Sequence, residues 1–460
     1  MSPAASGSIA LYPPTVSASE RPLSRPAFLL RALRNPLLTV PRLAYEEPIT
    51  ILRRGGLTLA WVSDPALVEE VLLAHAADFE KTPLEKRVFA PTLRDGVLTA
   101  DGKLWRWQRR AMAPMFRHSE IVRYVPAMAE AAEEQAGRWR TGPPSAIREF
   151  GRDMTDTTFA IIARTMLAGG LPAEAAIIKR ETARLLSNIS WEIAYALLRA
   201  PSWLPHPTYF TLRRAARRLR SSVGAIIARR QAEGGGGEDL LGRLLAARDP
   251  DSGEPMDHER LVSNLLTLLE AGHETTSRSL AWTFYLLARA PDWQERLRAE
   301  VLSVCRTEPV SAEHLPALSL TQQVLKEALR LYPAAPFLSR IAVSPITLAG
   351  ETLPPGSMVM MSVYAIHRHR RLWSDPDRFD PMRFTPEREA AYPRTQFMPF
   401  GAGPRFCLGA AFAMMEATVV LATLLRAARF EWDGRHAPQP ISRITLQPTG
   451  GMPLRVTLMD

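Results

Sequence analysis

A proline-free and mostly apolar segment from Asp257 to Ala290 constrains the fold more than any other part of the sequence. Its leucines and aromatic residues recur at helical spacing, and Pro291 marks its end. At 1.5 Å per residue, such a helix spans about 50 Å, the width of a whole domain. Because a helix that is apolar on most sides must be buried, we expect a fold built around this one central helix.

The secondary structure that the rest of the sequence predicts changes along its length. Helical periodicity dominates from about 100 to 300, whereas short strand-like runs with frequent Pro and Gly follow after about 330 and end in a helix over 410–428. Residues 49–63 predict a hairpin that turns at Gly55-Gly56. We therefore predict a mainly α fold with a small β-rich region. Residues 1–25 are Pro-, Ser- and Ala-rich and are expected to be loosely ordered, which leaves 26–460 as a single domain.

The composition excludes several classes of protein. Hydrophobic residues make up 46% and charged residues 23% of the 460, which indicates a globular chain rather than a disordered one. The net charge of +10 favours acidic partners, yet no nucleic-acid-binding motif accompanies it. Two cysteines make no disulfide framework, so a reducing compartment is expected, and Cys305 is interpreted as structural. No run reaches the ~20 apolar residues of a membrane span, so we expect a cytoplasmic protein.

The segment 397–417 carries the strongest chemical signal. Three glycines, Gly401, Gly403 and Gly409, surround the single cysteine Cys407. Small residues permit close approach of a flat, bulky ligand and let backbone N–H groups point at the sulfur. A helix that begins just after Cys407 would direct its positive end at a thiolate. A lone cysteine is ordinarily just a buried thiol, and only the whole pattern outweighs that interpretation.

That pattern, Phe400-x-x-Gly403-x-Arg405-x-Cys407-x-Gly409, resembles the haem-binding signature of the cytochrome P450 family. The resemblance implies the cytochrome P450 fold, with haem b held between the long central helix and the cysteine loop. It implies Cys407 as the axial ligand of the haem iron, with Phe400, Gly401 and Arg405 in contact with the cofactor.

Two further segments resemble other parts of the family in the expected order. Glu327 and Arg330 share a helix face at i, i+3 and, together with Arg383, resemble the Glu–Arg–Arg network that braces the loops beneath the haem. The family usually has Glu where this chain has Met382. Trp105 and Arg109 resemble the Trp-x-x-x-Arg helix that reaches one haem propionate. An amphipathic basic helix would explain this second segment equally well. Arg340 is expected at the other propionate.

The segment 271–276 in the central helix resembles the family's oxygen-activation segment. The resemblance implies proton delivery by Glu274 and Thr275, with Ala271 beside the haem. Gly272 is expected to leave room for a ligand above the iron, and His273 is not expected to be a ligand. An ordinary polar patch is the alternative, but an acid and hydroxyls on an apolar buried helix are costly.

The resemblance also implies a substrate pocket beneath an apolar roof at 197–210. Its expected lining comes from four places in the chain and comprises Phe89, Leu93, Val97, Leu98, Leu268, Ala335, Phe337, Leu338 and Met452.

Together these features predict a haem-thiolate monooxygenase in one catalytic domain. It would insert one oxygen atom from O2 into a C–H bond of a lipophilic small molecule such as a terpenoid, fatty acid or polyketide. Electrons would come from a separate ferredoxin or flavodoxin, docked on a basic face near Cys407 that includes Lys103, Arg106 and Arg110. We expect a monomer that neither binds nucleic acid nor spans a membrane.

Three alternatives differ in chemistry. A peroxide-driven haem-thiolate enzyme would typically lack the acid–alcohol pair, and Glu274-Thr275 is present. A haem-based sensor or carrier would not need that pair. A haem-free helical scaffold would not need the four motifs together.

Overall fold

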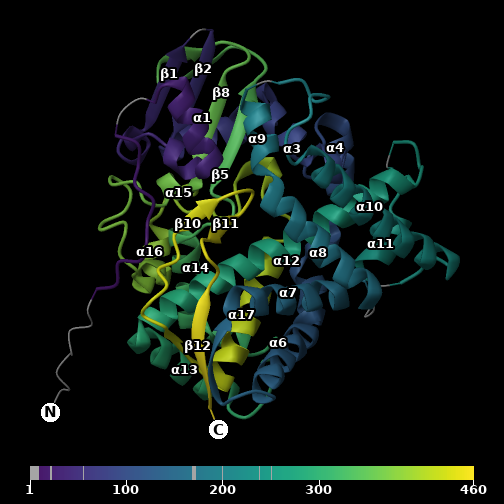
Figure 1. Ribbon diagram of the computed structural model, residues 1–460, viewed down its shortest axis with the longest axis vertical. Helices are drawn as coiled ribbons and strands as arrows, with labels where there is room; N and C mark the ends of the chain where they lie inside the picture. The colour runs from purple at the N-terminus through teal and green to yellow at the C-terminus, as the bar shows by residue number, and fades with distance from the viewer. Residues whose placement is uncertain are drawn as a thin grey trace.

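The computed structural model describes residues 10–20, 23–54, 56–167, 172–198, 200–237, 239–249 and 251–459. In Figure 1, the strands β1, β2 and β8 gather at one end of the molecule, while the helices α6, α13 and α17 occupy the other end. Helices make up most of the fold, so the prediction of a mainly α protein with a small β-rich region is confirmed.

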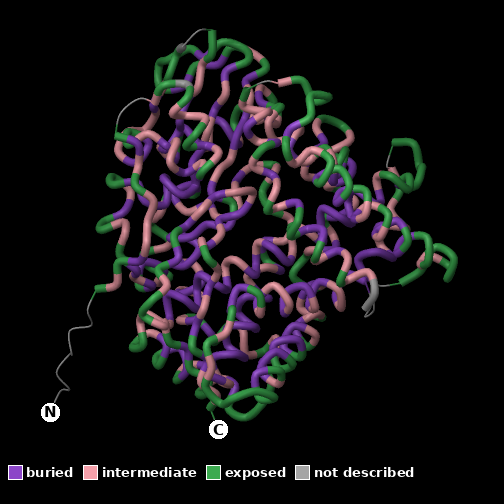
Figure 2. The backbone as a smooth tube through the Cα atoms, viewed as in Figure 1, coloured by how far each residue is buried: buried purple, intermediate pink, exposed green. Residues whose placement is uncertain are grey.

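The predicted central helix is α12, His258–Arg289. The Asp257 side chain caps it by accepting a hydrogen bond of 2.8 Å from the Arg260 N–H, and the helix ends just before Pro291. The helices that pack most extensively against it are α7 (Phe150–Met166), α10 (Tyr209–Ala232), α14 (Ser319–Leu331) and α17 (Ala410–Ala427). The backbone tube in Figure 2 is accordingly purple, or buried, through much of this region.

The remaining helices lie outside this central group. They are α1 (Arg25–Arg34), α2 (Pro65–Glu69), α3 (Pro83–Leu93), α4 (Gly102–Met112), α5 (His118–Ile121), α6 (Val125–Arg140), α8 (Pro172–Asn188), α9 (Ser190–Leu197), α11 (Leu240–Ala246), α13 (Pro291–Cys305), α15 (Val363–Ile366) and α16 (Pro386–Ala390).

The largest sheet has five strands in the order β1-β2-β8-β5-β3. These are β1 (Ile49–Arg54), β2 (Leu57–Val62), β8 (Met358–Ser362), β5 (Phe337–Ala342) and β3 (Phe79–Glu80). The hairpin predicted near the N-terminus is β1–β2; Gly55 lies outside the described residues, and Gly56 has a φ of +76°, as a tight turn requires. Strands β2 and β8 pair in parallel, so the hairpin joins the C-terminal half of the chain.

Three smaller sheets complete the described part of the fold. Strands β4 (Ser145–Glu149), β12 (Pro453–Leu458) and β9 (Ala428–Trp432) form one, and β6 (Ile346–Leu348) with β7 (Glu351–Leu353) another. The third is the hairpin of β10 (Pro440–Ser442) and β11 (Leu446–Pro448). Its turn lies against α12 and so helps to build the site described below.

The N-terminal segment differs from the expectation of loose order. Within residues 10–20 the backbone forms hydrogen bonds with two buried tyrosines. The Val16 N–H donates to the Tyr364 hydroxyl (3.1 Å), and the Tyr332 hydroxyl donates to the Pro14 carbonyl (2.9 Å). A buried phenol needs such a partner, and the segment supplies it. Residues 1–9, 21 and 22 lie outside the described residues.

Among the described residues, one helix has the length and hydropathy of a membrane span, and it is α17. Of that stretch, 72% is buried inside the protein. Buried core helices share these properties, so the feature is weak evidence for a span.

Candidate active site

The middle of α12 carries an accessible strip. Between 261 and 287 every residue is buried except Glu270, Ala271, Gly272, Thr275, Arg278 and Ser279. Ala271 is exposed outright, although the helix around it runs through the core. A local strip of accessible surface on a core helix marks a hollow inside the fold, and the predicted oxygen-activation segment lies on it.

The cysteine loop is shaped by glycines. Gly401 and Gly403 have φ values of +74° and +73°, which L side chains rarely adopt. A Cβ on Gly403 would also lie 2.0 Å from the Leu72 carbonyl oxygen, so only glycine fits there. The loop closes with a hydrogen bond of 3.0 Å from the Cys407 N–H to the Phe400 carbonyl.

The Cys407 thiol remains accessible within this loop. Protein nevertheless packs around its sulfur closely enough that desolvation raises the pKa of the thiol above its ordinary value. The Gly409 N–H, which bonds to the sulfur, and the charge of Arg109 both act in the opposite direction. The N–H and the cation are therefore already in position to stabilise a thiolate once a metal displaces the proton.

The loop lies close to the accessible strip because α17, which follows it, crosses α12. Glu416 of α17 lies beside Thr276, the residue after Thr275. Only six residues, about 9 Å of helix, separate Glu416 from the start of α17 at Ala410. Burial keeps the pKa of Glu416 well above its ordinary value, and the contact with Thr276 opposes this shift only in part. The sequence pattern assigns Glu416 no role.

Two arginines converge on one indole ring. The Arg405 guanidinium lies 4.5 Å from the ring centroid of Trp105, and the Arg109 guanidinium lies 5.9 Å from it. Arg405 also forms an ion pair with Asp101. The structure thus brings together three of the expected cofactor contacts, Trp105, Arg109 and Arg405, and adds Asp101, which the sequence pattern did not indicate. Asp101 occupies the N-cap position of α4, and that position alone would indicate a helix cap. Its side chain makes no cap bond there.

Arg340 on β5 completes a positive cluster with Arg109 and Arg405. Burial lowers the pKa of all three guanidinium groups, and the charges of Arg340 and Arg109 lower that of Arg405 further. Arg340 donates to the Ser339 carbonyl (2.7 Å) and has no ion pair within the described part of the chain. A buried cation without an ion pair, such as Arg340, favours an anionic ligand. With the accessible thiol and the glycine loop, this donor set fits a haem and its two propionates.

The acid of the oxygen-activation segment is held by the C-terminal hairpin. Glu274 Oε1 accepts hydrogen bonds from Arg278 Nε (2.9 Å), Thr445 Oγ1 (3.2 Å) and Gln447 Nε2 (3.3 Å). The Thr275 hydroxyl instead donates to the Ala271 carbonyl (2.7 Å). Arg278 was within reach of sequence reasoning, because it follows Glu274 by one helical turn. No sequence signal indicated Thr445 or Gln447.

Two residues of the same segment face α7 instead. A Cβ on Gly272 would lie 2.6 Å from Ile162 Cδ1, so Gly272 permits close packing against α7, and the expectation that it leaves room above an iron stays a prediction. His273 is buried, with Nδ1 2.6 Å from the Leu269 carbonyl and its ring against Phe159. Burial lowers the pKa of His273, which keeps the imidazole neutral.

The Glu–Arg–Arg network is assembled in the structure. Glu327 and Arg330 form a two-point ion pair with N–O distances of 2.7 and 2.8 Å, and Arg383 Nε lies 3.6 Å from Glu327 Oε1. Arg330 also donates to three carbonyls, those of His367, Pro376 and Arg378. The pair therefore holds the loop that leads into the cysteine segment.

The expected pocket residues differ in placement. Ala335 is exposed, Phe89, Leu98, Phe337 and Leu338 are partly buried, and Leu93, Val97 and Leu268 are buried. The Val97 N–H donates to Asn264 Oδ1 (2.8 Å), which ties the loop after α3 to α12. Leu338 Cδ1 would lie 3.7 Å from a Cβ on Gly401, next to the cysteine loop. Met452 is also buried, and its side chain packs in the core beside Gly151 on α7.

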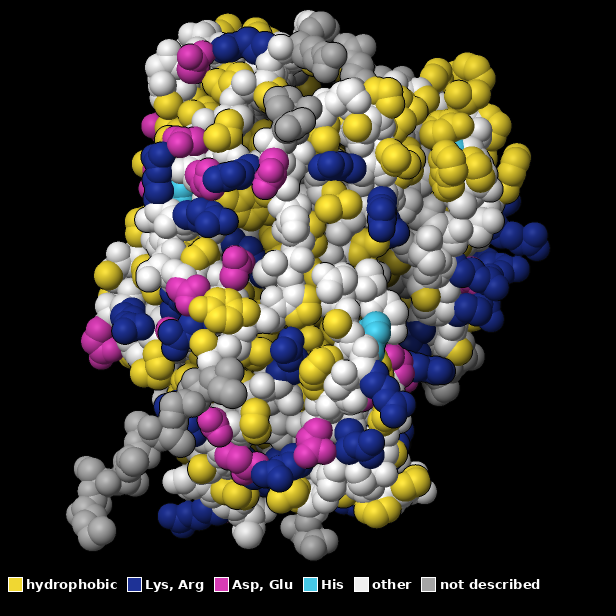
Figure 3. Space-filling model, turned by 60° about the vertical axis from the view of Figure 1, so that its left-hand side comes forward, with side chains coloured by type: hydrophobic (Ala, Val, Ile, Leu, Met, Phe, Trp, Pro, Cys, Tyr) yellow, Lys and Arg dark blue, Asp and Glu magenta, His cyan; other side chains and the backbone are white. Residues whose placement is uncertain are grey.

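The expected roof over 197–210 presents apolar side chains outward. Trp203 and Phe210 are 72% and 76% exposed. The contacts between this segment and the rest of the protein include polar ones. Glu192 on α9 accepts a hydrogen bond from Arg87 Nε and lies 2.7 Å from His206 Nε2. These contacts tie the segment to α3. Figure 3 shows a face of the molecule where apolar side chains gather at the upper right, beside Lys and Arg side chains.

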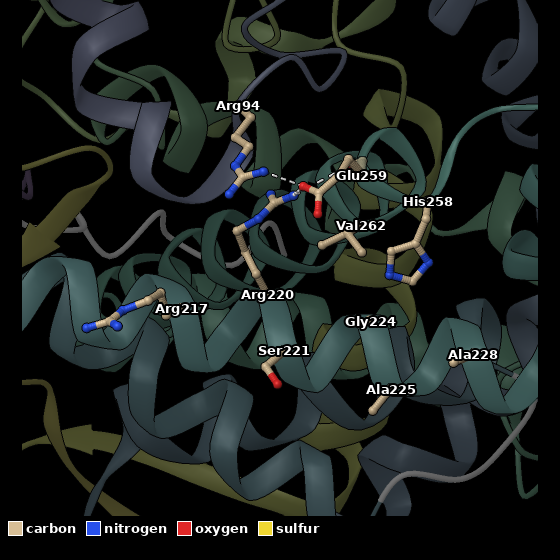
Figure 4. A pocket seen from close by; sticks show the side chains of 10 residues that line it. All are labelled: Arg94, Arg217, Arg220, Ser221, Gly224, Ala225, Ala228, His258, Glu259 and Val262. Carbon is tan, nitrogen blue, oxygen red and sulfur yellow. Dashed lines mark hydrogen bonds and ion pairs between the residues drawn. The ribbon is translucent and has the colours of Figure 1, made fainter.

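A separate hollow lies between α10 and the first turns of α12. Its volume is about 520 Å³, and Figure 4 shows Arg94 and Arg220 pointing at Glu259, with which both form ion pairs. Glu259 precedes Ala271 by twelve residues, about 18 Å along α12. This hollow therefore does not belong to the strip around Thr275.

Comparisons with known proteins agree with this geometry. The cytochrome P450 family model matches residues 30–454. The chain is 31% identical to "Cyclooctat-9-en-7-ol 5-monooxygenase" of Streptomyces melanosporofaciens, over 85% of this chain and 84% of the relative. It is 31% identical to "Pentalenene oxygenase" of Streptomyces avermitilis (92% and 93%) and to "Cytokinin hydroxylase" of Arabidopsis thaliana (87% and 78%). The chain belongs to the cytochrome P450 family and is a monooxygenase of that family.

Proposed function

We propose that this enzyme binds haem b through the Cys407 thiolate and inserts one oxygen atom from O2 into a C–H bond of a lipophilic small molecule. The observation that carries the proposal is the accessible Cys407 thiol, set in a loop that only glycines can form and faced by Arg109. When bound, the haem supplies the binding and activation of O2, for which thiolate ligation is suited.

The residues around the thiol have distinct tasks in this proposal. Arg109, Arg340 and Arg405 bind the haem propionates, and Trp105 packs beneath two of these guanidinium groups. Asp101 fixes the direction of Arg405 through their ion pair. The Glu327–Arg330 pair keeps the loop before Cys407 in place.

Proton delivery is assigned to Glu274 and Thr275. The Thr275 hydroxyl donates its proton to the Ala271 carbonyl, which leaves its oxygen free to accept a hydrogen bond from water on the accessible strip. Glu274 is held by Arg278 and the C-terminal hairpin, one position away. A rotation of the Glu274 carboxyl from these partners would carry a proton from the hairpin side to the Thr275 side.

The substrate is proposed to be a terpenoid, ahead of a fatty acid or polyketide. The partly buried apolar side chains of Phe89, Phe337 and Leu338 provide a lipophilic lining. Two relatives carry terpenoid names, cyclooctat-9-en-7-ol and pentalenene.

Electrons are proposed to come from an acidic ferredoxin or flavodoxin. Lys103, Arg106 and Arg110 are exposed on α4, the helix whose other face carries Trp105 and Arg109. An acidic partner on this face would approach the cysteine side of the haem. We further propose a monomer in the cytoplasm.

The spectrum of the reduced, carbon-monoxide-bound protein tests the proposal. Thiolate ligation gives a strongly red-shifted Soret band, which Cys407→Ser should abolish. Cys305→Ser is the matched control, because Cys305 is the other cysteine of the chain and is buried in the core. A histidine-type spectrum in the unmodified protein, or an unchanged spectrum in Cys407→Ser, would contradict the assignment.

A further inference from the structure

Glu270 is a carboxyl without a partner in the middle of the central helix. Its Oε1 is fully enclosed, and within the described part of the chain no hydrogen bond or ion pair reaches this side chain. The nine residues before it, 261–269, are all buried, whereas Glu270 keeps some accessible surface. An enclosed polar atom without a partner is costly, so a native fold that keeps one calls for an explanation.

The position of Glu270 on α12 places it at the border of the active site. Thr267, Glu270 and Glu274 share one helix face at i, i+3 and i+7. Thr267 Oγ1 would lie 2.8 Å from a Cβ on Gly96, in the loop after α3, and Glu274 bonds to Thr445 in the C-terminal hairpin. Glu270 therefore lies between the points where these two segments meet the helix.

The accessible strip begins at this residue. Glu270 is its first member, and the exposed Ala271 and the Thr275 hydroxyl follow directly along the helix. Ala271 lies about 100° around the helix from Glu270, so the carboxyl borders the surface on which the proposed oxygen chemistry takes place, from the side that it shares with Glu274.

The protonation state of Glu270 decides what it recognises. Burial, and secondarily the charge of Glu274, raise the pKa of Glu270 to about 8. At neutral pH the side chain is therefore mostly a neutral acid, with one O–H donor and one carbonyl acceptor. A cationic ligand would require the carboxylate, so a neutral hydroxyl or carbonyl group is the better match.

Other tasks for Glu270 fit less well. A structural role would require a partner, and none lies within reach among the described residues. A role in holding Glu274 is also excluded, because Glu274 Oε1 already receives three hydrogen bonds from other residues.

Resting on the proposed function, we propose that Glu270 binds an oxygen substituent, a hydroxyl or carbonyl, of an otherwise lipophilic substrate. The enzyme would then oxidise a molecule that an earlier reaction has already oxygenated, and the bond to Glu270 would select both the molecule and the orientation of its C–H bonds.

Matched ligand pairs that differ by one hydroxyl test this proposal. The probes are cedrol against cedrane and 1-adamantanol against adamantane. Each Kd is measured on the haem-loaded enzyme by spin-state titration and independently by calorimetry. We expect the unmodified enzyme to prefer alcohols about tenfold, the worth of one buried hydrogen bond. Glu270→Leu should abolish the preference, and Glu270→Gln should retain part of it.

The controls separate this proposal from the proposed function. Glu313→Gln removes an exposed carboxylate elsewhere and should leave every Kd unchanged. If Glu270→Leu does not fold, Glu270→Ala replaces it. The inference is overturned if no pair shows an alcohol preference, or if the preference survives in Glu270→Leu. An enzyme with a normal thiolate spectrum but no preference rejects this inference alone, whereas loss of that spectrum in the unmodified enzyme rejects the proposed function.

Discussion

Glu327 and Arg330 meet in an ion pair of two short contacts, 2.7 and 2.8 Å, with neither side chain exposed to solvent. Removal of one partner would leave the other charge buried and unpaired, which is far more costly than the loss of a surface pair. The pair therefore joins α14 to the loop before Cys407 with an interaction that tolerates no single substitution.

Glu327→Gln should lower the free energy of unfolding by about 3–5 kcal/mol. Urea denaturation followed by circular dichroism measures the change. Glu389→Gln is the matched control, because Glu389 pairs with Lys326 on the same helix while 35% of its side chain is exposed. Its cost should stay within about 1 kcal/mol. Equal effects of the two variants would contradict the structural role of the buried pair.

Gly272→Ala should destabilise the protein by about 1–3 kcal/mol, because the new Cβ would lie 2.6 Å from Ile162 Cδ1. Ile162→Val removes that methyl group, so the double variant should regain most of the lost stability. Thermal unfolding of the two single variants and the double variant measures this coupling. Additive effects would show that the close approach to α7 does not explain the glycine.

The stability difference between Glu270→Gln and the unmodified protein should grow from pH 5 to pH 8. The folded-state pKa of about 8 lies above the ordinary value of 4.5, so the folded protein holds a proton that the unfolded chain releases. The contribution of Glu270 to stability is complete below about pH 4.5 and declines as the pH rises towards 8. By pH 8 the variant should be more stable by on the order of 3 kcal/mol. Melting curves that stay parallel across this range would contradict the raised pKa.

Charge reversal of Arg106 and Arg110 together should slow reduction by an acidic electron-transfer protein about tenfold at low salt. Both side chains are exposed on α4. Stopped-flow reduction with a ferredoxin at several ionic strengths measures the effect. Reversal of Arg214 and Arg217 on α10 provides a control of equal charge on another helix. A reduction rate and salt dependence that remain unchanged would place the docking face elsewhere.

Local spacing predicted those parts of the site that lie within one or two helical turns. Glu327 with Arg330, and Trp105 with Arg109, are such pairs, because residues three or four apart share a helix face. The length of α12 likewise followed from an unbroken apolar pattern. These features depend on the chain's own periodicity, which the sequence displays directly.

The contacts that the sequence did not reveal join residues far apart in the chain. Glu274 meets Thr445 across 171 positions, and Arg405 meets Asp101 across 304. The close approach of Gly272 to Ile162 was likewise not predicted, because Ile162 belongs to another helix. Spacing contains no information about such partners, because packing of the whole chain decides them.

The parallel pairing of β2 with β8 determines when the fold can be completed during synthesis. Leu59 meets Met358, so nearly three hundred residues must leave the ribosome before the N-terminal hairpin finds its neighbour. Until then one long edge of the hairpin has free N–H and carbonyl groups, which invite pairing with the wrong chain. Because contacts of such high sequence separation form slowly, this strand pair is expected to be among the last to form, and newly made protein to be most prone to aggregation before it does.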